Sequence, residues 1–215
     1  MSTKARYAAL FGRGDSTDRI EFFSDAVFAI AMTLLVLDIR LPDITADQLN
    51  HELRELLPQM FAYALSFLVI SLNWISHHRK FRVITGFDDT LTRLNLLLLF
   101  LIAFLPFPTS VLSKFGSETS AVVLYAATSA AIAGSQVLIL WYARRANLLD
   151  MSVDRDVYRL MVYDGLVSPF VFVVSIGIAF LSPVGAMYSW IAIAPLSWLA
   201  SWWAGRSDPA SERLG

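Results

Sequence analysis

The sequence predicts an all-α, polytopic membrane protein with six transmembrane helices. Of its 215 residues, 56% are hydrophobic and only 16% are charged, and the mean hydropathy is +0.57. Soluble domains average about 45–50% apolar and about 25% charged residues, so this surplus of apolar surface does not fit a water-facing globule. The same content excludes a disordered chain. A net charge of −1 gives no sign of nucleic-acid binding, and the absence of cysteine excludes disulfides and thiolate metal sites.

Six long apolar runs predict the six helices. A bilayer-spanning helix needs about 20 mainly apolar residues. Runs of this length without alternation are helices and not the strands of a barrel. We expect spans over residues 20–39, 56–77, 93–112, 121–143, 160–181 and 186–204, all within a single membrane domain, 1–215.

The segments between the runs are polar and contain helix breakers. Pro42 follows the first run, and the acidic stretch 43–55 predicts a short surface helix before the second. Pro106 and Pro108 predict a bend or an end in the third span. The stretch 182–185, which contains Pro183, predicts a tight turn between the fifth and sixth spans.

The basic residues predict the orientation, because cytoplasmic loops carry an excess of Lys and Arg. Fourteen of the 17 basic residues fall on the side of the two termini, and three fall on the other. The first set comprises Lys4, Arg6, Arg13, Arg19, Arg79, Lys80, Arg82, Arg93, Arg144, Arg145, Arg155, Arg159, Arg206 and Arg213, and the second comprises Arg40, Arg54 and Lys114. We therefore expect a multi-pass protein of the cell membrane with both termini in the cytoplasm.

The opposite side is acidic. It carries Asp38, Asp43, Asp47, Glu52, Glu55 and Glu118. Such a rim attracts cations, although salt limits its reach. The alternative is that these carboxylates only keep a loop in water.

Asp25 is the unusual residue of the first span. A carboxylate inside an apolar run is costly in lipid, so it normally faces a bundle interior or an aqueous path and has a partner. At about 100° per residue, Ile30, Thr33, Leu34 and Leu37 share one face of the helix, whereas Asp25 falls close to the opposite face. If the aliphatic face lines a pore, Asp25 must contact neighbouring helices instead.

The run Arg19, Phe23, Ser24 and Asp25 (Arg-x-x-x-Phe-Ser-Asp) is similar to the signature of the transmembrane protein 175 family of potassium channels. The end of the second helix, Asn73 to Phe81, resembles that family's Trp/His helix end, with Trp74 and His77. The third helix adds Arg93, Asn95 and the stretch Phe104 to Thr109. The last three helices match only in length and character.

The resemblance implies a homotetramer that passes potassium ions, with possible proton permeability and no carbonyl filter. The first helix of each subunit would line the pore, with Ile30 as the narrowest ring and Thr33, Leu34 and Leu37 along the same stripe. A ring of aliphatic side chains blocks hydrated ions until it widens and becomes wet. Thr33 would either offer oxygens to a cation or bond back to the preceding turn.

The resemblance also implies a polar network that holds the first helix against the second and third. Its members are Arg19, Phe23, Ser24, Asp25, Trp74, His77, Arg93 and Asn95. We expect Asp25 to accept a hydrogen bond from a histidine, an arginine or an amide, with Trp74 packed beside it and His77 preferred over His78. Arg79 and Lys80 would extend towards the membrane surface as a basic helix end.

Other functions receive less support from the residues. Adjacent His77 and His78 point about 100° apart, so we expect no metal site, only transient potassium in the pore, and no cofactor. Ser24 and Asp25 are consecutive on a helix, so they do not form a triad with His77, and we expect no enzyme. A proton-coupled secondary transporter stays open as the main alternative, because membrane Asp and His residues can relay protons. A purely structural membrane protein is the other.

Overall fold

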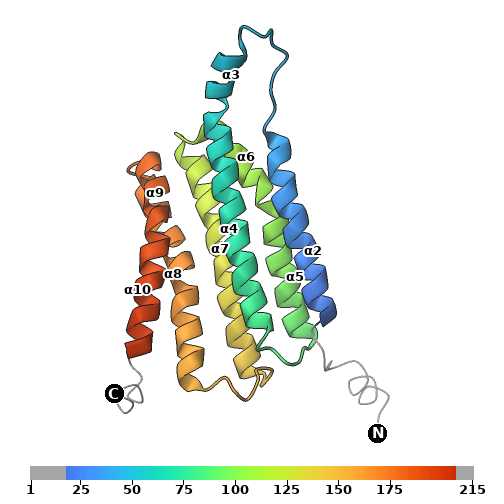
Figure 1. The fold of residues 1–215 in the computed structure, drawn as a ribbon. Helices are drawn as coiled ribbons and strands as arrows, with labels where there is room; N and C mark the ends of the chain where they lie inside the picture. Colours follow the sequence, from blue (N-terminus) through green and yellow to red (C-terminus); the bar gives the residue numbers. More distant parts are fainter. Residues whose placement is uncertain (1–17, 207–215) are drawn as a thin grey trace, which may run out of the picture.

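The structure is a computed structural model that describes residues 18–206, with side chains described through residue 200. Its long helices run side by side (Figure 1). The helices of the first half are α2 (Asp18–Leu34), which continues into the 3-10 turn η1 (Leu35–Asp38), α4 (Leu57–Phe81), α5 (Asp89–Phe104) and α6 (Pro106–Phe115). The short helix α3 (Leu49–Glu55) extends beyond the ends of the long helices.

The second half contributes α7 (Thr119–Arg145), α8 (Arg155–Ala179), α9 (Pro183–Ser189), the 3-10 turn η2 (Trp190–Ala192) and α10 (Ile193–Arg206). Among residues 18–206, six stretches are long and apolar enough to cross a membrane. They are Asp18–Asp38, Leu57–Phe81, Asp89–Phe115, Thr119–Arg145, Arg155–Ala179 and Pro183–Ala200. The predicted all-α class is confirmed.

Two spans begin four or five residues earlier than the apolar runs indicate. The third begins at Asp89 and not at 93, because the Asp88 carboxylate accepts a hydrogen bond from the backbone N–H of Leu91 and caps the helix. The fifth begins at Arg155 and not at 160, because Asp154 caps the N–H groups of Asp156 and Val157. In both helices the first turn is polar, so hydropathy does not reveal it.

Prolines interrupt two spans. The third breaks at Leu105, and a new helix begins at Pro106, as the prolines predict. The sixth contains the 3-10 turn η2 shortly before Pro195. Proline has no N–H to donate and its ring clashes with the carbonyl four residues earlier, so the turn before it cannot keep regular α geometry. Pro169, in contrast, lies inside a continuous α8.

The core lies around α7, which packs against α4, α5, α6 and α8. Tyr125, Ile132 and Ile139 of this helix are fully buried. By contrast, α2 packs mainly against α4 and α5 among the long helices and lies at the edge of the subunit (Figure 1). Within residues 18–206, one side of the first helix is therefore left uncovered.

We call the end of the bundle at which α2 begins the inner end, and the end at which η1 finishes the outer end. At the inner end, the α4–α5 and α7–α8 connections pair through an antiparallel bridge between Ile84 and Leu149. Thr85 N–H donates to the Leu148 carbonyl at 2.9 Å, and Asp150 N–H donates to the Val83 carbonyl at 2.8 Å. The two connections thus lie on one side, as the basic residues predict. Lys4, Arg6, Arg13 and Arg213 lie outside the described residues.

Candidate functional site

The first helix has a buried face and an exposed aliphatic face. Ser24, Phe28, Ala31 and Leu35 are buried at the helical spacing, against α4 and α5. The other side carries Ile30, which is 57% exposed, Leu34, which is 43% exposed, Leu37, which is 62% exposed, and the exposed Thr33. We call these four residues the aliphatic stripe. A single subunit leaves the stripe open to lipid or to another copy of the chain.

Three buried polar side chains form a directed chain of hydrogen bonds at the inner end. The Ser24 hydroxyl donates to the Ile20 carbonyl at 2.7 Å, so its oxygen accepts from Asn95 Nδ2 at 2.9 Å. The amide oxygen of Asn95 then accepts from His77 Nε2 at 2.9 Å. Each bond has one possible direction once the serine hydrogen is assigned. The chain therefore links α2, α5 and α4, and it requires a hydrogen on Nε2 of His77.

The acid of the first span has a different partner. Trp74 Nε1 donates to Asp25 Oδ1 at 2.8 Å, and the Trp74 ring stacks on His78 at 5.8 Å. The sequence placed Trp74 only as a packing neighbour and expected a histidine, an arginine or an amide as the donor. The indole takes this role because it lies on α4 beside the half-buried carboxylate, whereas His77 is directed to Asn95. We call Ser24, Asp25, Trp74, His77 and Asn95 the inner polar cluster.

The structure does not bring Arg19, Phe23 and Arg93 into the inner polar cluster. All three side chains are exposed in the described part of the chain, with Phe23 at 55%. Arg19 lies in the first turn of α2, Arg93 lies in the second turn of α5, and Phe23 lies on the exposed side of α2. The aromatic ring that does contact the cluster is Phe28, whose centroid lies 5.5 Å from that of His77. Phe81 stacks on His77 as well, with 4.2 Å between the ring centroids.

Thr33 makes a local bond. Its hydroxyl donates to the carbonyl of Ile30 at 2.8 Å, which is the back-bonded arrangement considered from the sequence. The bond uses the hydroxyl hydrogen and leaves lone pairs of the oxygen on the exposed side. The two expectations for Thr33 are thus compatible, because a cation needs only the oxygen.

A second polar group, which the sequence did not reveal, lies between α4 and α7. Lys80 Nζ donates to Ser76 Oγ at 2.8 Å and to Gln136 Oε1 at 3.3 Å, and Gln136 Nε2 donates to the Asn73 carbonyl at 2.8 Å. Lys80 is only 4% exposed, so the expectation that it extends to the membrane surface is wrong. Gln136 provides the polar partner that turns the lysine inward. A lone amide in the fourth span is the signal that could have indicated this group.

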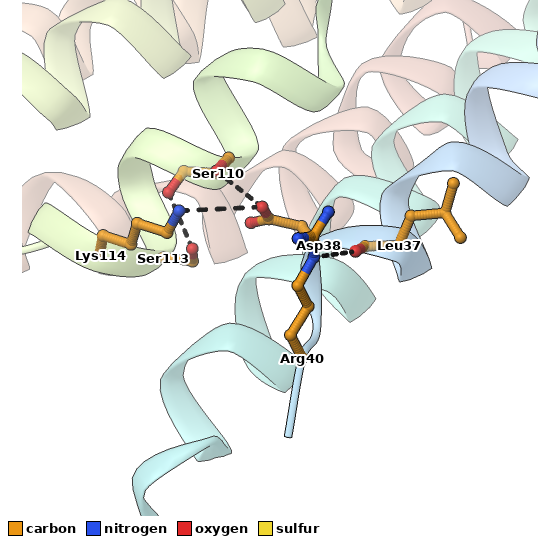
Figure 2. Close-up of polar contacts among 6 residues, drawn as sticks. All are labelled: Leu37, Asp38, Arg40, Ser110, Ser113 and Lys114. Carbon is orange, nitrogen blue, oxygen red and sulfur yellow. Dashed lines mark hydrogen bonds and ion pairs between the residues drawn. The ribbon is translucent and has the colours of Figure 1, made fainter. Parts of the chain in front are cut away.

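A third contact group lies at the outer end, where η1 meets α6 (Figure 2). Ser110 Oγ donates to Asp38 Oδ1 at 2.9 Å, and Lys114 Nζ lies 4.0 Å from the same oxygen. Asp38 therefore interacts with the subunit and is not a free acid of the rim. Farther out, a hydrogen bond from the Thr45 side chain lowers the pKa of the exposed Asp47 carboxyl below its ordinary value, so this acid is charged at neutral pH.

Among the described residues, no three His, Asp or Glu side chains gather in a way that could hold a metal ion. His77 and His78 themselves are directed to different neighbours, Asn95 and the Trp74 ring. The inner polar cluster and the Lys80–Gln136 group join helices. What the fold and the site define is a six-helix membrane protein whose first helix is fixed on one face and bare on the other.

Residues 19–106 match the family model described as the endosomal/lysosomal potassium channel TMEM175. The chain is 34% identical to a potassium channel of Streptomyces collinus over 174 residues, which are 78% of this chain and 84% of that protein. It is also 34% identical to a potassium channel of Chamaesiphon minutus over 199 residues, which are 89% of this chain and 95% of that protein. The chain belongs to the TMEM175 family.

The fold agrees with that assignment. The structure is similar to the crystal structure of a lysosomal potassium-selective channel TMEM175 homolog from Chamaesiphon minutus, with a TM-score of 0.75 and 31% identity over 86% of this chain and 97% of that one. The family resemblance seen in the sequence is thereby confirmed. All twelve candidate residues lie within the segment that the family model matches. The comparisons give no support to the transporter alternative.

Proposed function

We propose that this protein is a potassium channel of the cell membrane in which several copies of α2 surround a central pathway. Family membership supports the function, since the relatives of Streptomyces collinus and Chamaesiphon minutus carry the name potassium channel. The single observation that carries the mechanism is the division of α2 into a fixed face and a bare face. The number of copies, four, follows the resemblance to the family.

The aliphatic stripe suits the wall of such a pathway. Ile30 lies at its middle and is 57% exposed, so in an assembly its branched side chain meets its copies around the axis. A ring of this kind excludes water when narrow and admits hydrated cations after a small widening or rotation of the helices. Leu34 and Leu37 extend the stripe towards the outer end, and Thr33 adds a hydroxyl oxygen beside Ile30.

The inner polar cluster would support the proposed pathway from the face of α2 that is opposite the aliphatic stripe. Ser24 and Asn95 are buried, and both belong to the chain that joins α2 to α4 and α5. Buried polar groups are costly without partners, so these bonds resist displacement of the helix. The cluster would thus hold the inner part of the first helix while the stripe controls passage.

The orientation with both termini in the cytoplasm rests on the basic residues. The sequence assigns fourteen of the 17 Lys and Arg residues to the side of the two termini, and the connections around Ile84 and Leu149 meet at the inner end. Potassium ions, the lipid bilayer and further copies of the chain are the partners that this function requires. Protons are a second permeant ion to be measured in the same system.

The test is single-channel recording of purified protein in planar bilayers, under potassium, sodium and proton gradients. Ile30→Asn should raise the unitary conductance, because a polar ring holds water in the narrowest part of the pathway. Val173→Asn is a matched control, since Val173 of α8 is 58% exposed and lies outside the stripe. Fluxes that saturate like carrier turnover, without unitary currents, would contradict the proposal. Identical currents for Ile30→Asn and the native protein would contradict the assignment of the constriction.

A further inference from the structure

We propose that Asp38 is a positioning residue. Through Ser110 and Lys114 of α6, it holds the last turn of the first span as a 3-10 helix and so sets the direction of Leu37. What Leu37 does in an assembled channel rests on the proposed function. The positioning itself is a property of the chain and is testable without ion currents.

The turn η1 departs from the α geometry of the rest of the span. In a 3-10 helix, residues i and i+3 lie above one another, because three residues complete a turn. Leu37 thus lies above Leu34 on the exposed side, and Asp38 lies above Leu35, which is 2% exposed. The carboxylate therefore points into the subunit, towards α6, while Leu37 stays 62% exposed.

The contacts of Asp38 join the turn η1 to α6 (Figure 2). Its Oδ1 accepts from Ser110 at 2.9 Å and lies 4.0 Å from the ammonium group of Lys114, one turn farther along α6. The end of the turn is closed separately, because Arg40 Nε donates to the Leu37 carbonyl at 3.4 Å and Ile39 N–H donates to the Val36 carbonyl at 3.1 Å. Side chains on both sides of η1 thus stabilise the tight geometry.

Without these contacts, we expect the turn to relax to α-helical geometry. The hydrogen bonds of a 3-10 helix are poorer than those of an α-helix, and residues 35–38 contain no proline or glycine that favours the tighter form. Rewinding to α geometry changes the advance from about 120° to about 100° per residue. Over the three residues from Leu34 to Leu37, the Leu37 side chain would therefore turn by about 60°.

The ion pair is half-exposed, with side-chain exposures of 53% for Lys114 and 34% for Asp38. Pairs of this kind are weak and are screened by salt. Such a contact can position a side chain and still be released during a conformational change, unlike the buried bonds of the inner polar cluster. The first span is thus fixed firmly at one end and reversibly at the other.

The absence of cysteine from the sequence permits a direct test. Leu37→Cys places one thiol on the protein, and the rate of its modification by a charged maleimide is followed by mass spectrometry on purified protein in nanodiscs. In the native background the thiol should react readily. Asp38→Ala should slow the reaction several-fold, and the charge-swapped pair Asp38→Lys with Lys114→Asp should restore it. Ser110→Ala and Lys114→Met should each slow it less.

Leu34→Cys is the matched control, because Leu34 precedes the turn and its rate should stay constant in every background. Equal rates for the thiol at position 37 in all backgrounds would overturn the proposal, and so would an unreactive thiol in the native background. A parallel loss at both positions would also overturn it, since that would show a general disturbance. The labelling does not depend on ion currents. If Asp38→Ala slowed the labelling of the thiol at position 37 while the native protein conducted no ions, the positioning role of Asp38 would stand and the proposed channel function would be refuted.

Discussion

The Trp74 indole and the Asp25 carboxylate are joined by a hydrogen bond of 2.8 Å between α4 and α2. The bond directs the acid of the first span into the subunit, on the side opposite the aliphatic stripe. A carboxylate in this position therefore orients the helix and does not line the proposed pathway. The charge of Asp25 thus has a structural role in the contact between α2 and α4.

Replacing Trp74 with Phe should lower the free energy of unfolding by about 1 kcal/mol, because it keeps an aromatic ring but removes the indole that donates to a half-buried carboxylate. Thermal unfolding of the purified protein measures the effect. Asp25→Asn combined with Trp74→Phe should cost less than the sum of the two single changes, as expected for contacting residues. Trp141→Phe, on an exposed part of α7, is the control and should change the melting temperature little. If the losses of the two single variants added up fully in the double variant, the hydrogen bond between Trp74 and Asp25 would be contradicted.

Asn95→Leu should be more damaging. It leaves the buried His77 Nε2–H without its acceptor, which costs about 1–3 kcal/mol, and it removes a bond of about 1 kcal/mol to Ser24, whose hydroxyl keeps the Ile20 carbonyl. We expect a loss of about 2–4 kcal/mol in the free energy of unfolding. Asn73→Leu is the matched control, because the side chain of Asn73 donates only to the Val69 carbonyl within its own helix. Similar losses for both variants would mean that the bonds between helices contribute no more to stability than a bond within one helix.

Gln136→Leu should destabilise the protein by about 1–3 kcal/mol, because Lys80 and the Asn73 carbonyl then lose a partner inside the bundle. Adding Lys80→Met should recover part of that loss, since removing a buried charge together with its partner is often neutral or stabilising. Chemical unfolding of the single and double variants checks both statements. A double variant that is less stable than Gln136→Leu would refute the assignment.

Thr33→Val should reduce the preference for potassium over sodium, because it removes the oxygen that the back-bonded hydroxyl leaves on the exposed side. Thr33→Ser retains that oxygen and should behave like the native protein. Reversal potentials under opposed potassium and sodium gradients give the measurement. We expect the value for Thr33→Val to move towards zero, and an unchanged value would exclude this oxygen from selectivity.

The sequence predicts the number of spans well, because hydropathy reports burial in a membrane directly. It misses the starts of α5 and α8, where Asp88 and Asp154 cap polar turns that hydropathy discounts. It also misses the 3-10 turn at Leu35–Asp38, since no residue in the turn demands it. The 3-10 geometry is accompanied by contacts with α6, and contacts between segments that are distant in the sequence cannot be predicted from the local sequence.

In the candidate site, too, local geometry could be predicted from the sequence and contacts between helices could not. Helix geometry alone separates Asp25 from Ile30, and the structure has them on different sides of α2. The partners are harder to predict, because they depend on the rotation of α4 against α2 and α5. That rotation directs His77 to Asn95, leaves Trp74 for Asp25 and turns Lys80 inward to Gln136. The roles of the aliphatic stripe and of the inner polar cluster in conduction stay predictions.

The bridge between Ile84 and Leu149 joins the two halves of the chain at the inner end. During synthesis, the connection that contains Ile84 leaves the ribosome well before its partner does. The corner between α4 and α5 must therefore wait, with Val83 and Thr85 unpaired, until the fourth helix and the start of the following connection have been made. A fragment that ends after α6 would contain all twelve candidate residues and yet lack the bridge that closes this corner.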